Sequence, residues 1–234
     1  MFCQTISVSN PKEWKQRDEK RPFKDNKEII SIRLAKILVN LVGLKEKQTL
    51  LDPFCGYATV LQEALLTGLN ILGIEKDTHK SQVAQKNLEW IQKQFSTKGT
   101  IKIYNKDASQ LASFLSPNSF HGVATEPYLG PYLKKRPTPY QAKTTIQELE
   151  PLYQTLFSKL AQLMKSNQKI VFIFPVFEWD RQKSITISPA VFAPWFYNTN
   201  PLQKKGPQFA KAFPAAYQNP KNKLKRTIWI LTRK

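Results

Sequence analysis

Four short apolar segments of the sequence each run into an acidic side chain, in a pattern that could hold a small polar ligand. The four acids, in chain order, are Asp52, Glu75, Asp107 and Glu126. If the segments are parallel strands, their carboxyl ends meet at one edge of a sheet, where open α/β folds bind ligands. Any single acid could instead cap a helix or lie in solvent. The series of four favours a ligand site.

The first of these ends is the stretch DPFCGYAT, residues 52–59, which predicts a strand-to-helix turn. Gly56 has no Cβ and lets a ligand approach the backbone closely. The chain has no GxGxxG and no P-loop lysine at this point, which argues against a dinucleotide or a nucleoside triphosphate. Glu75 lies 23 residues after Asp52, where an acid can accept both hydroxyls of a ribose. We therefore expect adenosine without phosphates as the ligand.

The fourth end is the stretch VATEPYLGP, residues 123–131, in which Glu126 is followed by Pro127 and Tyr128. Pro127 fixes the backbone directly after this carboxylate, so the strand would deliver Glu126 to the edge of the sheet as an acceptor for a ligand. Tyr128 can contact the same ligand with its ring. The alternatives are a capping or solvated acid at a turn, and a tyrosine that packs in the core.

Short apolar runs alternate with segments of helical periodicity, which favours βαβ units and a largely parallel sheet. The expected helices cover residues 28–42, 58–66, 78–95 (capped by Thr78) and 146–164, and the expected strands 49–51, 71–74, 100–104, 120–125, 170–174, 183–188 and 227–232. Residues 1–27 form an N-terminal extension with little regular structure, and residues 28–234 form the domain. The Pro- and Lys-rich segment 189–225 is expected to be an irregular surface excursion.

The chain is strongly basic, with 36 Lys and Arg against 17 Asp and Glu and a net charge of +19. After Asp180 come eleven Lys or Arg residues and no acidic side chain. Such a field recruits polyanions, so a nucleic acid is the expected partner, although solubility or a basic proteome would give the same bias. The candidate contacts are Arg21, Lys134, Lys135 and Arg136. Arg21 could instead fold over the ligand site with the rest of the N-terminal segment, and residues 134–136 could form a solvated loop. Phe209, Phe213 and Tyr217 of the basic tail either stack on single strands or pin an insertion to the core.

Other features of the composition bear on location and metal content. The two cysteines, Cys3 and Cys55, lie far apart, which suggests a reducing compartment, and with only two histidines we expect no metal site. The sequence shows no secretory signal pattern and no apolar run of membrane-spanning length. We therefore expect a cytoplasmic protein that does not cross a membrane.

The motifs DPFCGYAT, GIEKD, NKDAS and TEPYLG, in that order and spacing, resemble those of class I S-adenosylmethionine-dependent methyltransferases. They are most similar to the tRNA guanine-N2 methyltransferases of the guanosine-10 group, which carry a DPFCGTG loop and a catalytic DPPYG. The lead-in RPFKDNKEIISIRLAKILVNLVG also resembles that group. The resemblance covers residues 17–174 and is looser after Pro131.

This resemblance implies a Rossmann-like domain with a mostly parallel seven-stranded sheet and helices on both faces, and S-adenosylmethionine as cofactor. The implied cofactor-binding residues are Asp52, Phe54, Cys55, Gly56, Glu75, Lys76, Asp107 and Ala108. Asp52 and Gly56 would line the methionine part, Glu75 would bind the ribose, and Asp107 would stand near adenine. The residues that hold the base to be methylated would be Glu126, Pro127 and Tyr128.

The sequence departs from the resembled group in two ways. It reads EPYLG in place of DPPYG, so the acid is longer and one proline is lost. Members of the group bind tRNA through a THUMP domain, for which the first 27 residues are too short, so RNA recognition would come from a partner protein or the basic tail, or the substrate would differ. The function implied is methylation of guanosine N2 in tRNA. A DNA amino-methyltransferase acting on adenine or cytosine, an inert RNA-binding relative and a small-molecule methyltransferase are the alternatives.

Overall fold

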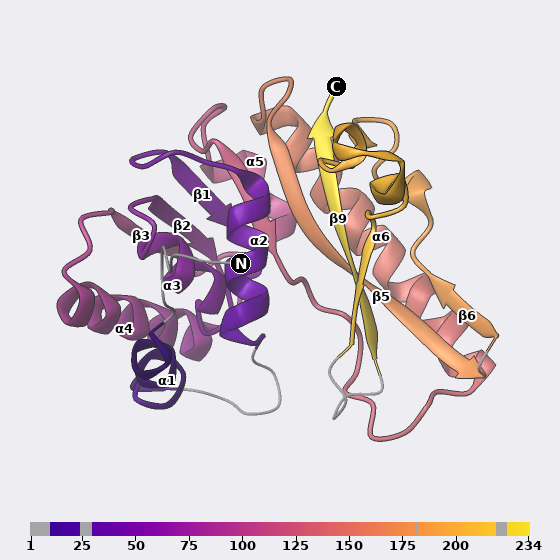
Figure 1. Ribbon diagram of the computed structural model, residues 1–234, viewed down its shortest axis with the longest axis horizontal. Helices are drawn as coiled ribbons and strands as arrows, with labels where there is room; N and C mark the ends of the chain where they lie inside the picture. Colours follow the sequence, from indigo (N-terminus) through magenta and orange to yellow (C-terminus); the bar gives the residue numbers. More distant parts are fainter. Residues whose placement is uncertain (1–9, 24–29, 181, 219–223) are drawn as a thin grey trace, which may run out of the picture.

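A nine-stranded sheet organises the described part of the chain (Figure 1). The computed structural model describes residues 10–23, 30–180, 182–218 and 224–234. The strand order is β3-β2-β1-β4-β5-β9-β7, with β6 paired to β5 and β8 paired to β9. An α/β fold with helices and a central parallel sheet is thereby confirmed. The described residues form two strands more than the seven expected, because β7 and β8 lie in the segment that was expected to be irregular.

Five parallel strands form the half of the sheet that comes first in the sequence. They are β3 (Ile101–Tyr104), β2 (Asn70–Ile74), β1 (Thr49–Asp52), β4 (Gly122–Thr125) and the first part of β5 (Lys169–Asp180). The apolar side chains of the four inner strands are almost fully buried, as expected for parallel strands covered on both faces, whereas those of the edge strand β3 are partly buried. The parallel registers bring the ends of β1, β2, β3 and β4 to one edge.

Two groups of helices cover the sheet. The helices α2 (Ile32–Val42), α3 (Thr59–Leu65) and α4 (Thr78–Phe95) pack side by side, and α5 (Leu111–Phe114) packs on α6 (Pro139–Leu163). Figure 1 shows α2 in front of the sheet and α6 behind it. Gly43 ends α2 in the left-handed conformation, as the sequence predicts. Three helix starts differ from expectation: Ser31 caps α2, so that the helix begins at Ile32 and not at residue 28; Asp77, not Thr78, caps α4; and a Thr138 capping box starts α6 seven residues early.

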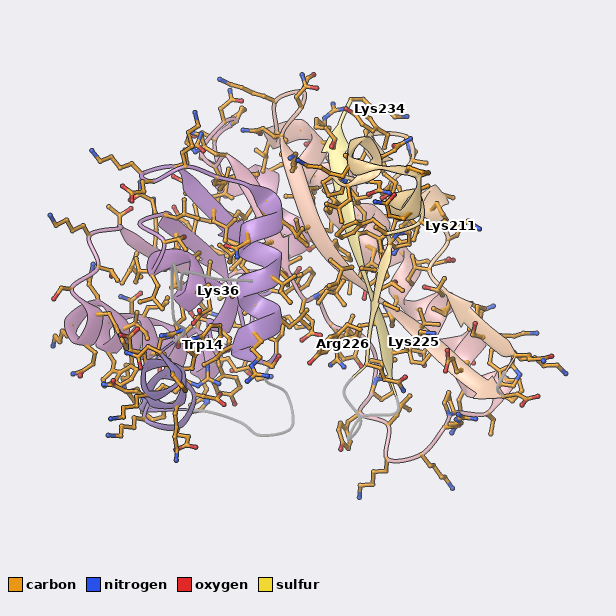
Figure 2. The ribbon with its side chains drawn as sticks, in the orientation of Figure 1. Trp14, Lys36, Lys211, Lys225, Arg226 and Lys234 are labelled. Carbon is orange, nitrogen blue, oxygen red and sulfur yellow. The ribbon has the colours of Figure 1, made fainter. Side chains whose placement is uncertain are left out.

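The N-terminal segment contains a helix, α1 (Pro11–Glu19), where little regular structure was expected. Asn10 caps it by accepting hydrogen bonds from the first turn, and Pro11 fits the first helical position. Trp14 of α1 contacts the ammonium of Lys36 on α2, and Arg17 pairs with Glu63 of α3 (Figure 2). The segment therefore packs on the domain, and the signal that was missed is the Asn-Pro cap.

The C-terminal half of the sheet is antiparallel and more extensive than the sequence predicts. The strand β5 continues to Asp180, and its last part pairs with β6 (Lys183–Thr186). The strand β9 (Lys225–Arg233) pairs with the first part of β5 from Lys225 to Thr232. The opposite edge of β9 takes two three-residue strands, β7 (Phe196–Asn198) and β8 (Ala215–Tyr217). Phe213 and Tyr217 are partly buried against the core, so they pin this segment to the domain.

Among the described residues, no helix has the length and apolarity that a membrane crossing requires.

Candidate active site

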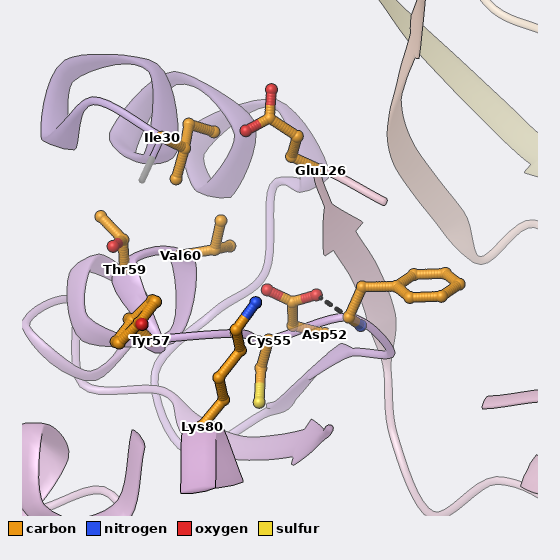
Figure 3. Close-up of a pocket in the computed structure, with 10 residues that line it drawn as sticks. Ile30, Asp52, Cys55, Tyr57, Thr59, Val60, Lys80 and Glu126 are labelled. Carbon is orange, nitrogen blue, oxygen red and sulfur yellow. Dashed lines mark hydrogen bonds between the residues drawn. The ribbon is translucent and has the colours of Figure 1, made fainter. Parts of the chain in front are cut away.

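A pocket of about 440 Å³, part of it open to solvent, lies at the edge where the parallel strands end (Figure 3). Its lining residues are Ile30, Asp52, Phe54, Cys55, Gly56, Tyr57, Thr59, Val60, Lys80 and Glu126. Five of these were predicted as site residues from the sequence. The other predicted cofactor residues, Glu75, Lys76, Asp107 and Ala108, follow neighbouring strands and lie outside this lining.

The loop between β1 and α3 forms the floor of the pocket. Asp52 is buried, and its Oδ1 accepts hydrogen bonds from the Phe54 backbone N–H at 3.1 Å and from Thr125 Oγ1 at 2.6 Å. Gly56 adopts a positive φ of +50°, and Ala58, where the resembled motif carries glycine, also adopts a left-handed φ of +66°. Burial raises the pKa of Asp52 to about 7, and the charges of Glu75 and Glu126 add to the shift.

Glu75 fixes the neighbouring strand end to this loop. Its Oε2 accepts from the Gly56 backbone N–H at 3.1 Å, and its Oε1 accepts from the Asp77 backbone N–H at 2.9 Å. Each carboxylate oxygen has a second lone pair, so a pair of ligand hydroxyls can still be bound. Asn105, which the sequence did not indicate, supports this turn by donating to the backbone carbonyls of Glu75 and Lys76.

Asp107 begins the short 3₁₀ helix η1 (Ala108–Gln110) that follows β3. Its Oδ1 accepts from the Ser109 backbone N–H at 2.8 Å, and this bond lowers the pKa of Asp107. Ala108 is buried. Asp107 thus has a capping role in this structure, and its contact with an adenine ring stays a prediction.

The stretch 126–128 presents three different chemical groups at the end of β4. Glu126 Oε1 accepts a hydrogen bond from Arg226 Nε in an ion pair whose partners are 13% and 14% exposed. Pro127 is buried, whereas the ring of Tyr128 is 57% exposed and is not packed in the core. The Tyr128 carbonyl accepts from the hydroxyl of buried Tyr153 at 2.6 Å, which fixes the backbone here.

The sequence profile of the family described as "RMKL-like, methyltransferase domain" matches residues 19–178. This range contains the whole parallel half of the sheet and every strand end that borders the pocket. The chain belongs to this family. As an RMKL-like methyltransferase domain, it carries its family motif on the elements that build the pocket, while β9 lies beyond the matched range.

Known proteins resemble this RMKL-like domain in sequence and in fold. A tRNA (guanine(10)-N2)-dimethyltransferase of Methanocaldococcus jannaschii is 30% identical over 147 residues, which are 61% of this chain and 37% of that protein. The crystal structure of TrmN from Thermus thermophilus superposes with a TM-score of 0.62 at 16% identity, covering 94% of this chain and 53% of that one. The crystal structure of magnesium protoporphyrin IX methyltransferase from Synechocystis, solved with bound SAM, superposes with a TM-score of 0.54 at 9% identity. The superposition covers 99% of this chain and 100% of that one. The match thus spans about a third of the methanogen protein's length.

Two cations of the RMKL-like domain, one beside the pocket and one in its lining, were not singled out from the sequence. Arg226 was counted with the basic tail, but it lies near the start of β9 (Figure 2) and pairs with Glu126 of the pocket. Lys80 of α4 extends into the pocket toward Asp52, and its ammonium lies 5.9 Å from the Tyr57 ring centre (Figure 3). No local pattern distinguishes either side chain from a solvated surface cation, because the contact is made by a distant segment.

The predicted nucleic-acid contacts fall into two groups. Lys134, Lys135 and Arg136 are exposed in the loop between β4 and α6, so the structure leaves them accessible to phosphates. Arg21 is 4% exposed and donates to Thr59 Oγ1 at 2.8 Å, which corrects its assignment as a surface contact.

Within the described ranges, no cluster of three or more His, Cys, Asp or Glu side chains could hold a metal ion.

Proposed function

We propose that this chain transfers a methyl group from S-adenosylmethionine to an exocyclic amine of RNA, namely N2 of a guanosine in tRNA. The observation that carries the proposal is the placement of Glu126 on the wall of the pocket, two residues before the exposed ring of Tyr128. The name of the methanogen relative supports the base and the RNA class. We further propose that the reaction takes place in the cytoplasm.

The residues that line the pocket and those at its border fit the proposed cofactor. Glu75, at the end of β2, offers lone pairs to the ribose hydroxyls, and Gly56 leaves space beside the backbone. Asp52 lies at the floor of the pocket, where a carboxylate suits the ammonium of the amino-acid end. When bound, S-adenosylmethionine supplies an electrophilic methyl group on a sulfonium.

The residues at the end of β4 would act on the substrate amine. Among the described residues, only Oε1 of Glu126 is engaged by Arg226, so Oε2 can accept an amine N–H. The backbone that Pro127 and the Tyr153 hydroxyl hold in place offers a second acceptor. Together they orient the amine lone pair without prior removal of a proton. The increase in the rate of methyl transfer would therefore come from positioning and electrostatics. Tyr128 would stack on the base, which must be flipped out or lie in a loop.

The proposal is tested by incubating the purified chain with S-adenosylmethionine labelled in the methyl group and with tRNA, other RNA or DNA. We expect label in tRNA, and nucleoside mass spectrometry should identify N2-methylguanosine. Label in DNA would assign the amino-methyltransferase alternative, and binding of S-adenosylmethionine without transfer to any substrate would favour an inert relative. The reaction is repeated with added cell extract, because a large gain would reveal a partner protein that supplies tRNA recognition.

Replacing Arg226 with Met is expected to shift the acid limb of the pH profile of methyl transfer to higher pH. Burial raises the pKa of Glu126, and the Arg226 guanidinium is the group that opposes this shift. Because the ionised carboxylate is the acceptor, activity lost at neutral pH should return as the pH rises. Arg226→Lys retains the charge and should keep the limb near its wild-type position. A loss of equal size at every pH would contradict this role.

A further inference from the structure

The guanidinium of Arg21 is buried beside the pocket with its hydrogen-bonding capacity only partly used. The side chain follows α1 and is 4% exposed. Its Nη1 donates to Thr59 Oγ1 at 2.8 Å, while its Nε is buried and has no hydrogen-bond partner among the described residues. Buried donors are almost always paired, so an unpaired one calls for an explanation.

One of the two acids that act on this guanidinium, Glu63, is already engaged elsewhere. Glu63 accepts from Arg17 Nε at 3.1 Å and from Arg17 Nη2 at 3.4 Å, and it also accepts from Gln62. Within the described ranges, no carboxylate forms an ion pair with Arg21. Burial accordingly lowers the pKa of Arg21, with only partial compensation from Asp18 and Glu63. A buried cation of this kind is costly unless an anion joins it.

The position of Arg21 relative to the pocket indicates where such an anion would come from. Thr59, its hydrogen-bond partner, lines the pocket together with Tyr57 and Val60. Figure 3 shows Thr59 and Tyr57 on one side of the pocket, and Asp52 and Cys55 farther toward the opposite side. The pocket therefore has the Asp52 carboxylate on its floor, with Lys80 extending toward it, and the Arg21 guanidinium behind the wall formed by Thr59, where it can meet the carboxylate of an amino-acid zwitterion.

We propose that Arg21 binds the carboxylate of the amino-acid moiety of S-adenosylmethionine, through the donors that Thr59 leaves unused. This inference rests on the proposed function, because it takes that cofactor as the ligand. A guanidinium binds a carboxylate through two parallel N–H donors, and such charge-assisted bonds are among the stronger ones in proteins. The segment after α1 would thus hold the cofactor at the end opposite to the ribose.

Isothermal titration calorimetry with two ligands tests the proposal. Decarboxylated S-adenosylmethionine keeps the adenosine, the sulfonium and the amine and lacks only the carboxylate. We expect wild-type protein to bind S-adenosylmethionine about 10- to 100-fold more tightly than the decarboxylated ligand, the range for a hydrogen bond to a charged group. In Arg21→Met this ratio should fall close to one, and Arg21→Lys should retain part of it.

Arg17→Met is the matched control, because Arg17 is a similarly buried arginine four residues earlier that pairs with Glu63, whereas Arg21 donates to Thr59 of the pocket lining. It should lower the melting temperature and leave the affinity ratio unchanged. A wild-type protein that binds both ligands equally, or an Arg21→Met protein that weakens both equally, would overturn the assignment while leaving the cofactor intact. If Arg21→Met does not fold, the ratio in Arg21→Lys decides. Failure of wild-type protein to bind either ligand would overturn the proposed function itself.

Discussion

Replacing Glu126 with Gln is expected to lower the rate of methyl transfer by about 10²- to 10³-fold, the usual effect of removing one preorganised polar group from an active site. Gln has the same shape, but it replaces one acceptor oxygen with a donor and removes the charge that Arg226 balances. The amine would then lose the acceptor that orients its lone pair. Single-turnover rates with labelled cofactor measure the change, and calorimetry shows whether S-adenosylmethionine still binds.

Glu178→Gln provides the matched control for this substitution. Glu178 lies on β5 and pairs with Lys225, the residue next to Arg226 on β9, but it does not line the pocket. Its replacement removes a glutamate and an ion pair to the same strand without touching the candidate site. We expect a near-wild-type rate. Equal effects of the two variants, or a near-wild-type rate for Glu126→Gln with cofactor bound, would refute the assignment of Glu126.

Replacing Asp52 with Asn is expected to stabilise the unliganded protein at pH 8 and to weaken its binding of S-adenosylmethionine at least about tenfold, as loss of a charged hydrogen-bonding partner does. The pKa of Asp52 is raised from 3.8 to about 7 in the folded state. The protonated Asp52 side chain therefore makes its full contribution to the free energy of unfolding below about pH 3.8, and this contribution is lost as the pH rises through 7. The loss amounts to at most about 4 kcal/mol, and an Asn side chain, which does not ionise, is not subject to it. Chemical denaturation at several pH values measures the effect.

Asp77→Asn is the control for the pH dependence. Asp77 caps α4 from an exposed position, and its pKa is lowered by the hydrogen bond from the Lys80 backbone N–H. Asn caps a helix about as well as Asp. Wild-type protein and Asp77→Asn should therefore lose stability in parallel between pH 5 and 8, whereas Asp52→Asn should not. A parallel loss in Asp52→Asn would show that Asp52 is not the buried acid responsible.

The sequence by itself determined the parallel half of the sheet and the acids at its edge. The alternation of apolar runs with helical periodicity is local, and β1, β2, β3 and β4 are each followed by a helix that neighbouring residues encode. Asp52, Glu75 and Glu126 could be placed at one edge because parallel strands end together. The glycine that ends α2 was predicted for the same reason, since a helix stop depends on adjacent residues.

The C-terminal part of the sheet was decided by tertiary structure. The strands β7 and β8 have three residues each, and their stability comes from pairing with β9, not from their own composition. Propensity in so short a segment carries little information, because strand preference depends on its cross-strand neighbours. A Pro- and Lys-rich segment was therefore expected to be irregular, although part of it completes the sheet.

The roles of two arginines show the same limit within the site. Arg21 and Arg226 were both assigned to basic surfaces, yet both are largely buried beside the pocket. Because β9 is antiparallel, it begins at the edge where β4 ends, and this brings Arg226 to Glu126 across 100 positions of sequence. The sequence tells which side chains carry a charge. Whether that charge meets solvent or a carboxylate depends on which distant segments the strand order brings together.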